Sequence, residues 1–585
     1  MQQKRLNLEA NKSIIKEVLV ELSTKTSSNL KENEKILRKY RSVESEVFSK
    51  SLLLTTYEDL KRAGEINFSS EEETNIYSLL RMKETRTISG VTPVTVLTKP
   101  FPCPGKCIFC PNDIRMPKSY LSDEPGAQRA ISNKFDPYLQ TFNRLLAFKN
   151  TGHPIDKIEL IILGGTWSSY PESYQIWFVK RCFDALNDFE KHNSSIMIKD
   201  EDMSLPFEES KLEEIDGEQM SKTYNQIISN AIKNTQNILK ENSTWEELFA
   251  AHLLNETSKS KCVGLVIETR PDEINEDEVI KIRKLGATKI QIGIQSLNDE
   301  VLKLNKRGHD TQKTIEALDL IRRAGFKIHG HYMPNLYGSN PEMDILDFEK
   351  MFSEIEFRPD ELKIYPCSLI KTAELMKYYN QGLWKPYTQD ELGEVISHHI
   401  LTTPRYCRLT RIIRDIPSTD IVVGNKLTNF RQIAENLIKK SGKKVNEIRS
   451  REIKTKEYEN SITTKITEYE TKSSLEYFIE YVNANDEIFG FLRLSLPKIS
   501  SFIPELAGCA MIREIHIYGQ SMEVGKKDAN KTQHQGLGKN LIELASKISK
   551  EKGYKKLAVI SAIGTRKYYE KNGFKLENLY QVKEL

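Results

Sequence analysis

The sequence lacks the long apolar segments of a membrane protein. None of its hydrophobic runs approaches the roughly 18 residues that cross a bilayer, and its mean hydropathy is −0.51. The first residues, Met1–Arg5, lack the apolar core of a secretory signal. Glycine is also scarce, with 28 among 585 residues, which excludes a collagen-like chain. We therefore expect a globular, cytoplasmic protein that does not bind a membrane.

The sequence also lacks an excess of charge of either sign. Lys and Arg total 86 against 82 Asp and Glu, which leaves a net charge of +4. This balance does not identify a nucleic-acid-binding protein, so any basic surface must arise from local clustering. The length of 585 residues predicts about three to four domains of roughly 150 residues each.

Cysteine is rare and unevenly distributed. Five of the eight cysteines are isolated, whereas Cys103, Cys107 and Cys110 lie close together. A secreted disulfide scaffold would place more cysteines in a shorter chain. The triplet therefore predicts metal or cluster ligation in a reducing compartment.

The first two thirds of the chain predict a helical region followed by a barrel. Apolar residues at helical spacing indicate a basic helical N-terminal region over residues 1–80. Strands and helices then alternate over residues 81–400, with a polar insertion near residues 193–260. Such units imply parallel strands joined by right-handed crossovers, hence a full or partial (β/α) barrel with ligands at the carboxyl ends of its strands. The expected strands are Val91–Leu97, Lys157–Leu163, Val263–Ile267, Lys289–Gly293, Phe326–His331 and Glu361–Tyr365.

The rest of the chain predicts a linker and a second domain. Residues 401–470 form a basic connecting region, and residues 471–585 indicate a small α+β domain. Its expected strands are Tyr477–Val482, Ile488–Leu494, Ala510–Ile517 and Lys556–Ser561.

The cysteine spacing C-x3-C-x2-C favours an iron–sulfur cluster over zinc. Three thiolates on one loop can ligate three irons of a [4Fe–4S] cluster and leave the fourth iron open for S-adenosylmethionine (SAM). Structural zinc needs four ligands, and no Cys or His pair with ligand spacing completes a set nearby. This segment resembles the radical SAM superfamily. Gly164, Gly165 and Thr166, at the end of a strand, would expose backbone groups to the amino group of SAM, although a tight turn explains two glycines equally well.

A glycine loop in the C-terminal domain precedes an amphipathic helix. The loop runs from Gln533 to Lys539, and backbone N–H groups at a helix start can hold a pyrophosphate. Together with the downstream segment Arg566–Phe574, it resembles the GNAT acetyl-CoA-binding domain. We expect one tyrosine of the pair Tyr568 and Tyr569 to pack in the core and the other, Tyr569, to face the cofactor as the catalytic residue.

The combination resembles the Elongator catalytic subunit family, the tRNA uridine(34) carboxymethyl-forming enzymes. The resemblance covers roughly residues 80–585. It rests on the segments Arg86–Val91, Lys99–Pro104, Phe135–Gln140, Glu268–Asp272, Arg307–His309, Arg414–Pro417, Arg449–Glu452 and His534–Gly536. It implies a radical SAM (β/α) partial barrel followed by a GNAT-type α+β domain, with a helical N-terminal region.

The resemblance also implies an activity and its cofactors. A radical derived from SAM takes hydrogen from the methyl group of acetyl-CoA, and the carbon radical adds to C5 of the wobble uridine. Thioester hydrolysis then leaves a carboxymethyl group, and an external electron donor reduces the cluster. The expected acetyl-CoA contacts are Lys157, Glu514, Ile515, His516, Ile517, Gln533, Gly536, Leu537, Gly538, Lys539 and Tyr569.

The basic connecting region would bind the anticodon arm of tRNA. Its cations would follow the phosphates, and Tyr406 and Phe430 would stack on loop bases. These cations are Arg405, Arg408, Arg411, Arg414, Lys439, Lys440, Lys443 and Lys444. The sequence leaves open which tRNAs are modified, whether the chain forms a homodimer and whether it needs accessory subunits.

Two other functions remain open at this point. The first is a protein lysine acetyltransferase whose iron–sulfur domain is only structural. The second is a tRNA-binding scaffold in which both catalytic domains have decayed, although the intact cysteine triplet and glycine loop argue against it.

Overall fold

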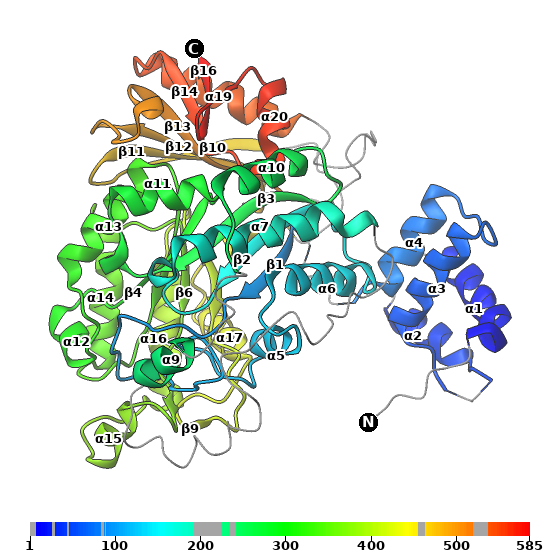
Figure 1. The fold of residues 1–585 in the computed structure, drawn as a ribbon, viewed down its shortest axis with the longest axis horizontal. Coiled ribbons are helices and arrows are strands. Elements are labelled where there is room, and N and C mark those ends of the chain that lie inside the picture. Colours follow the sequence, from blue (N-terminus) through cyan, green and yellow to red (C-terminus); the bar gives the residue numbers. More distant parts are fainter. Residues whose placement is uncertain are drawn as a thin grey trace.

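The structure is a computed structural model. It describes residues 8–25, 30–43, 46–82, 87, 89–191, 224–233, 241–453, 462–518 and 536–585. Figure 1 shows three parts: a group of N-terminal helices at one side, a central barrel, and a second sheet carrying the C-terminus above the barrel. No helix in these ranges is long and apolar enough to cross a membrane.

The N-terminal helices form a small bundle with its own core. Its helices are α1 (Leu8–Ser23), α2 (Leu30–Lys39), α3 (Lys50–Arg62) and α4 (Ser70–Leu80). Leu19, Leu53 and Ile76 are buried together inside it. A capping box between Ser69 and Glu72 fixes the start of α4 by satisfying backbone N–H groups that the helix itself leaves free. The predicted helical N-terminal region is confirmed.

The central barrel is built on an open parallel sheet. Its strand order is β1-β2-β3-β4-β5-β6-β8, and every neighbouring pair is parallel. The strands are β1 (Thr92–Leu97), β2 (Lys157–Leu163), β3 (Lys261–Thr269), β4 (Lys289–Gln295), β5 (Lys327–Tyr332), β6 (Glu361–Ile364) and β8 (Arg408–Ile412). Six of these seven strands match the sequence-based expectation, and the partial barrel is confirmed.

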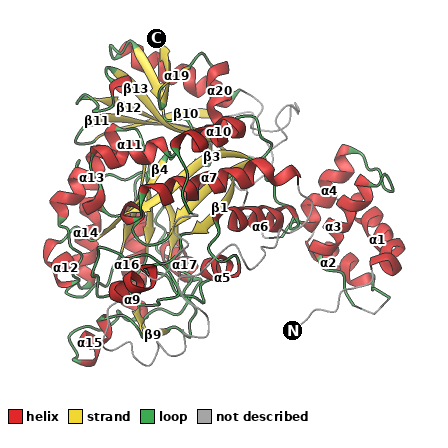
Figure 2. Cartoon of the chain, in the orientation of Figure 1, coloured by secondary structure: helices red, strands yellow, loops and turns green. Residues whose placement is uncertain are grey.

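Helices cover the outer face of the sheet, as Figure 2 shows. They are α5 (Pro125–Ser132), α6 (Pro137–Lys149), α7 (Glu172–Asp188), α11 (Glu276–Lys284), α13 (Thr311–Arg323), α14 (Pro341–Ser353) and α16 (Gln389–Thr402). Helices α12 (Asp299–Leu304) and α15 (Leu375–Asn380) instead pack beside Ile108 in a separate hydrophobic cluster. Alternate residues of β2 point outward into this layer, and Ile158, Leu160 and Ile162 are buried there. The residues between them therefore face the interior of the barrel.

The polar insertion lies partly outside the described residues. Its described helices are α9 (Tyr224–Lys233) and α10 (Trp245–Asn255). The first is attached to the cysteine loop, because Asn225 exchanges two hydrogen bonds with the backbone of Cys103 and the Tyr224 hydroxyl donates to the carbonyl of Met116. This part of the insertion therefore supports the loop that carries the cysteines.

The expected connecting region contributes to the barrel. It contains β8, β9 (Ile421–Val423), α17 (Phe430–Lys440) and α18 (Ile448–Arg451). The barrel sheet therefore extends past the boundary expected at residue 400. A short two-stranded sheet joins β9 to β7 (Leu369–Ile370).

The C-terminal domain is a mixed sheet with two helices. Its strands are β10 (Thr463–Glu470), β11 (Ser474–Val482), β12 (Ile488–Pro497), β13 (Cys509–Ile517), β14 (Lys556–Val559), β15 (Lys575–Glu577) and β16 (Tyr580–Glu584). Its helices are α19 (Leu537–Glu551) and α20 (Arg566–Lys571). Among its described strands, β13 and β14 are the parallel pair and the other neighbours are antiparallel. The sheet begins at β10, eight residues before the expected boundary at 471, because β10 is a mostly exposed edge strand with little apolar pattern.

Short 3-10 helices occur at several turns. They are η2 (Trp167–Ser169), η3 (Phe189–Lys191), η5 (Pro271–Glu273), η6 (Pro504–Leu506) and η8 (Ile563–Thr565).

The second sheet closes the amino-terminal end of the barrel. Asp360, just before β6, accepts hydrogen bonds from Arg513 of β13, and Arg493 of β12 lies 3.5 Å away. All three side chains are buried. Although burial opposes it, the charges of Arg513 and Arg493 hold the pKa of Asp360 below its ordinary value. One continuous hydrophobic core also spans both sheets.

Candidate active site

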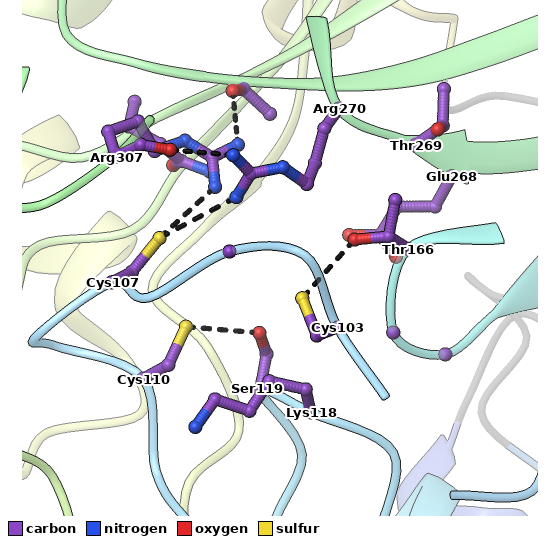
Figure 3. A pocket seen from close by; sticks show the side chains of 15 residues that line it. Cys103, Cys107, Cys110, Lys118, Ser119, Thr166, Glu268, Thr269, Arg270 and Arg307 are labelled. Carbon is purple, nitrogen blue, oxygen red and sulfur yellow. Dashed lines mark hydrogen bonds between the residues drawn. The ribbon is translucent and has the colours of Figure 1, made fainter. Parts of the chain in front are cut away.

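The three cysteines lie on the loop between β1 and α5 and line one pocket (Figure 3). Cys103 and Cys107 are buried, and Cys110 is half-buried. The pocket lies at the carboxyl ends of the barrel strands, where the sequence analysis expects ligands. Its other lining residues are Gly105, Lys118, Ser119, Gly164, Gly165, Thr166, Glu268, Thr269, Arg270, Gly293, Gln295 and Arg307.

Each cysteine sulfur has its own polar neighbour around the pocket. Cys103 Sγ lies 3.4 Å from Thr166 Oγ1, and Cys110 Sγ lies 3.3 Å from Ser119 Oγ. Cys107 Sγ accepts a hydrogen bond of 3.3 Å from Arg307. Across the described residues, no three Cys, His, Asp or Glu side chains are arranged to hold a single metal ion. Three thiols standing around a shared space instead fit a larger cluster that is ligated at separate corners.

The electrostatics of the pocket favour a thiolate at Cys107. The hydrogen bond with Cys110 and the charges of Arg307 and Arg270 hold the pKa of Cys107 well below its ordinary value, although burial opposes this. A thiolate is the form of cysteine that ligates metal. The pocket therefore offers the ligand chemistry that an iron–sulfur cluster needs.

Two arginines of this pocket are held in place by other groups. Arg270, directly after β3, donates to Asp272 and to the carbonyl of Arg307, while Arg307 donates to the carbonyl of Gly293. Although burial opposes it, hydrogen bonds from His309 and Arg270 lower the pKa of Asp272. Asp272 therefore stays ionised and orients Arg270. Arg270 and Asp272 end a strand and were expected to point into the barrel mouth, whereas Arg307 was noted only as part of a motif.

Backbone strain marks two further pocket residues: Gln295, whose segment was expected at the barrel mouth, and Ser119, which no sequence motif indicated. Ser119 has φ of 83° and Gln295 has φ of 71°, which side chains other than glycine rarely adopt. Such strain persists only where the surrounding structure enforces it, and it is common at functional sites. No sequence pattern predicts this strain, because neither residue is a glycine.

The predicted glycine pair lies at the pocket, as expected. A side chain at Gly164 would place its Cβ 1.9 Å from Thr98 Oγ1, so only glycine fits there. Gly165 and Thr166 continue the turn along the pocket wall, and Thr166 is the neighbour of Cys103. Their contact with SAM stays a prediction.

The predicted acetyl-CoA residues gather around β13, β14 and α19. The two strands pair only as far as Ile512 and Val559, whereas β13 continues along β12 to Ile517. The strands therefore separate beside the residues expected to contact acetyl-CoA. Gly536, at the start of α19, has φ of 74° and open space around its Cα. The expected contact Gln533 lies outside the described residues.

The tyrosine pair differs from the expectation. Tyr568, expected in the core, is 43% exposed, and its hydroxyl lies 2.7 Å from the position of a Cβ at Gly538. The assignment of Tyr568 to the core is therefore wrong, since it lies on the glycine loop. Tyr569 is only 8% exposed and packs on Phe574. Burial raises its pKa, and so does the nearby charge of Glu514. Its cofactor role stays a prediction.

The expected contacts on β13 have clear structural partners. Glu514 pairs with Lys327 of β5 and with Arg493 of β12. His516 stacks on Phe491, and burial lowers its pKa to about 4, so it is neutral at neutral pH. Ile515 and Ile517 are half-buried against the core of the domain. Glu514 thus faces the barrel, which the sequence analysis did not foresee.

Lys157 lies where the two domains meet. It begins β2 beside Lys261 of β3, and Gly564 of the C-terminal domain approaches Lys261 so closely that a Cβ there would lie 2.6 Å from Lys261 Cβ. Burial lowers the pKa of Lys157. The structure brings this residue to the domain that holds the other predicted acetyl-CoA contacts.

Most of the arginines expected to follow tRNA phosphates are instead paired with carboxylates. Arg405 pairs with Glu480 and Asp486, Arg408 with Glu452, and Arg414 with Glu124. These partners lie far away in sequence, so the pairing could not be read from the local pattern. The expectation that these three arginines bind phosphates is wrong.

Among the other predicted tRNA contacts, some side chains are buried or paired and others are exposed. Tyr406 and Phe430 are buried, the first stacked on Tyr469, so the expectation that they stack on bases is wrong. Arg411 pairs with Asp415, and Lys444 lies 3.3 Å from Asp486. Lys439, Lys440 and Lys443 are exposed at the end of α17 and after it, and their contact with tRNA stays a prediction.

Comparison with known proteins places this arrangement in a family. Residues 241–348 match the model of the radical SAM superfamily, and residues 359–440 match the radical SAM C-terminal domain. The tRNA uridine(34) acetyltransferase of Methanocaldococcus infernus is 37% identical over 538 residues, which cover 89% of this chain and 90% of that protein. The chain belongs to the family of tRNA uridine(34) acetyltransferases and Elongator complex protein 3. This membership confirms the resemblance found in the sequence.

Two further members extend the comparison. Elongator complex protein 3 of Danio rerio is 32% identical over 525 residues, which cover 86% of each protein. The solved structure of the archaeal Methanocaldococcus infernus Elp3 with an N-terminal deletion (1–46) matches with a TM-score of 0.67 and 34% identity. It covers 85% of this chain and 100% of that chain. For this family, the radical SAM model implies a [4Fe–4S] cluster and SAM, and the acetyltransferase name implies acetyl-CoA.

Proposed function

We propose that this protein is a tRNA uridine(34) acetyltransferase that forms carboxymethyluridine at the wobble position by radical SAM chemistry with acetyl-CoA. The observation that carries the proposal is that the cysteine pocket and the predicted acetyl-CoA site lie at the two ends of one barrel. The cysteine pocket lies at the carboxyl ends of its strands, and the separating strands β13 and β14 lie over the amino ends. Family membership over most of the chain supports the same activity.

Cys103, Cys107 and Cys110 would hold the cluster, and Gly164, Gly165 and Thr166 would contact SAM. When bound, the cluster and SAM supply the one-electron chemistry that removes a hydrogen atom from an unactivated carbon. The protein orients the reactants and keeps water away from them. Arg270 and Arg307 contribute by donating to the Cys107 sulfur from fixed positions.

The acetyl donor would bind at the C-terminal domain. The start of α19 offers free backbone N–H groups to the pyrophosphate, and Gly536 leaves that approach open. Tyr569 keeps its proton because burial raises its pKa. Its hydroxyl can therefore donate a hydrogen bond to acetyl-CoA. The other proposed contacts are Lys157, Glu514, Ile515, His516, Ile517, Gln533, Leu537, Gly538 and Lys539.

The proposed macromolecular partner is the anticodon arm of tRNA. Lys439, Lys440 and Lys443 remain as exposed cations that can neutralise phosphates. An external electron donor completes the proposed reaction. Accessory subunits fit the membership of relatives named for the Elongator complex.

The decisive experiment is a full reconstitution. The protein is loaded anaerobically with iron and sulfide and incubated with tRNA, SAM, acetyl-CoA and dithionite. Nucleoside mass spectrometry should then detect carboxymethyluridine, and omission of SAM should abolish it. A protein lysine acetyltransferase would instead acetylate lysines without SAM, and that outcome with unmodified tRNA would contradict the proposal.

A further inference from the structure

One side of the barrel interior, formed by β4, β5 and β6, is polar along its length. The inward-facing residues of β4, β5 and β6 are charged or hydrogen-bonding, whereas barrel interiors are usually filled with branched apolar side chains. At the end near the C-terminal domain, Glu361 lies within 3.3 Å of Lys289 and Lys327, and Lys327 pairs with Glu514. Near the cysteine pocket, His331 lies 3.5 Å from Glu268.

One wall of the lumen is accessible to solvent. The inward residues of β2 are all half-buried, whereas the outward residues between them are buried. Glu159, in the middle of this wall, keeps 26% of its side chain exposed although it lies inside the barrel opposite Lys289. This accessible wall begins at Lys157, a predicted acetyl-CoA contact, and leads to Gly164 in the cysteine pocket.

Lys363 lies in the middle of this lumen and forms no direct ion pair with a described carboxylate, while the charge of Glu268 acts on it from further away. Its ammonium donates one hydrogen bond of 2.6 Å, to Gln291 Oε1, and across the described residues no carboxylate lies within ion-pair distance. An ammonium has three N–H donors, so two remain for another partner. Gln291 in turn lies 3.2 Å from His331 Nε2. Burial lowers the pKa of Lys363 to about 8, which still leaves it charged at neutral pH.

The position of Lys363 and the size of the ligand together indicate which ligand can accept hydrogen bonds from its two remaining N–H groups. Lys363 is two residues beyond Glu361 on β6, which places it about 6.6 Å further from the C-terminal domain. Glu361 and Lys289 are buried at the amino end, so a group from the C-terminal domain must reach Lys363 along the accessible wall of β2, and it must be slender to do so. The two-carbon acyl end of a thioester is such a group, and its carbonyl oxygen accepts hydrogen bonds.

We propose that the barrel lumen binds the acyl end of the acetyl donor and that Lys363, held by Gln291, binds its carbonyl oxygen. This inference rests on the proposed function, because it takes the acetyl donor from there. It adds a substrate-binding residue that no motif in the sequence indicates. It also places the methyl group of the donor on the side of the lumen that leads to the cysteine pocket.

The test compares two ligands that differ only in the carbonyl oxygen, acetyl-CoA and S-ethyl-CoA. Their dissociation constants are measured by calorimetry on the full-length protein with its cluster reconstituted. We expect the unmodified protein to prefer acetyl-CoA by about tenfold, the value of one hydrogen bond from a charged donor. Lys363→Met should bind both ligands equally, with the affinity for S-ethyl-CoA unchanged.

Two controls keep this result interpretable. Lys350→Met removes an exposed lysine from α14 and should retain the preference. Lys363→Met should fold, because it replaces an unpaired, buried ammonium with an apolar side chain of similar length, and thermal unfolding checks this. Should Lys363→Met fail to fold, Lys363→Gln takes its place in the same comparison.

The outcomes separate this inference from the proposed function. If the preference survives in Lys363→Met, or if the unmodified protein shows none, the inference is overturned, even where carboxymethyluridine forms. If both CoA affinities fall together in Lys363→Met, or if only tRNA binding weakens, Lys363 does not bind the carbonyl oxygen and the inference is again overturned. If carboxymethyluridine does not form but the preference depends on Lys363, the proposed reaction fails and the acyl site stands.

Discussion

The two ends of the barrel use charged residues in opposite ways. At the amino end, Asp360, Arg493 and Arg513 pair with one another across the domain boundary and are fully buried. At the carboxyl end, Arg270 and Arg307 donate to a cysteine sulfur at the wall of the cysteine pocket. Charged residues at the amino end therefore hold the two domains together, whereas those at the carboxyl end are available to a ligand.

The largest effect should follow from changing the carboxyl end. Replacement of Cys103, Cys107 or Cys110 with Ala removes a cluster ligand, so the visible iron–sulfur absorption and the cleavage of SAM should both be lost. Absorption spectroscopy and detection of 5′-deoxyadenosine measure the two effects. The isolated, buried Cys182 provides the control, and Cys182→Ala should retain both. Persistent modification of tRNA by the triple variant would refute the radical assignment.

The next effect should appear in stability, at the amino end. Asp360→Asn removes the carboxylate that two buried guanidinium groups share, and leaves Arg493 with Glu514 and Arg513 with Glu476. It should cost about 3 kcal/mol of unfolding free energy. Chemical denaturation measures this, and Glu470→Gln, in an exposed pair with Lys498, is the control that should change nothing. Because the pKa of Asp360 is lowered in the folded protein, its contribution is present above about pH 4 and is lost as the pH falls below that value.

A change in the glycine loop of the C-terminal domain should have a smaller effect. Gly536 has a positive φ, so Gly536→Glu strains the start of α19 and places a negative side chain near the expected pyrophosphate. Acetyl-CoA affinity should fall at least about tenfold by calorimetry, and carboxymethyluridine should be lost. Iron content and tRNA binding should remain, since the cysteine pocket lies at the opposite end of the barrel from the C-terminal domain. Normal modification by this variant would remove the donor site from the C-terminal domain.

The preference for acetyl-CoA over S-ethyl-CoA should depend on pH, because it depends on the charge of Lys363 between the two ends of the barrel. Lys363 has its pKa lowered to about 8, so it loses its proton as the pH rises through that value. The groups facing it are Glu268, Lys289, His331, Arg411 and Arg414. The preference for acetyl-CoA over S-ethyl-CoA should therefore decline above pH 8 and stay flat in Lys363→Arg. A flat profile in the unmodified protein would argue against an ammonium at the acyl group.

The smallest effect per residue should come from the surface lysines. Joint replacement of Lys439, Lys440 and Lys443 with Glu should weaken tRNA binding several-fold and make its salt dependence shallower. Filter binding at several salt concentrations measures both effects. Arg405 offers the contrast, because its carboxylate partners already neutralise it. Unchanged affinity would place the tRNA surface elsewhere.

The sequence was informative where chemistry depends on local spacing. The cysteine triplet, Gly164 with Gly165, and six of the seven barrel strands could be predicted because neighbouring residues define them. Arg408 and Arg414 were misassigned because their partners come from distant segments. Lys363 was not identified because alternating polar and apolar residues on β6 read as a strand with one face in solvent, whereas that face lies inside the barrel.

The shared core has a consequence for how the chain is made on the ribosome. Arg283, on α11 of the barrel, donates to the carbonyls of Ser561 and Leu579, and Tyr580 of β16 donates to the carbonyl of Ala324. The C-terminal domain, which supplies these partners, is synthesised after the whole barrel. The barrel therefore keeps unsatisfied donors and uncovered apolar surface until that domain has emerged, unlike the N-terminal bundle, which can fold as soon as it emerges. Nascent chains stalled before residue 561 should bind chaperones through the barrel.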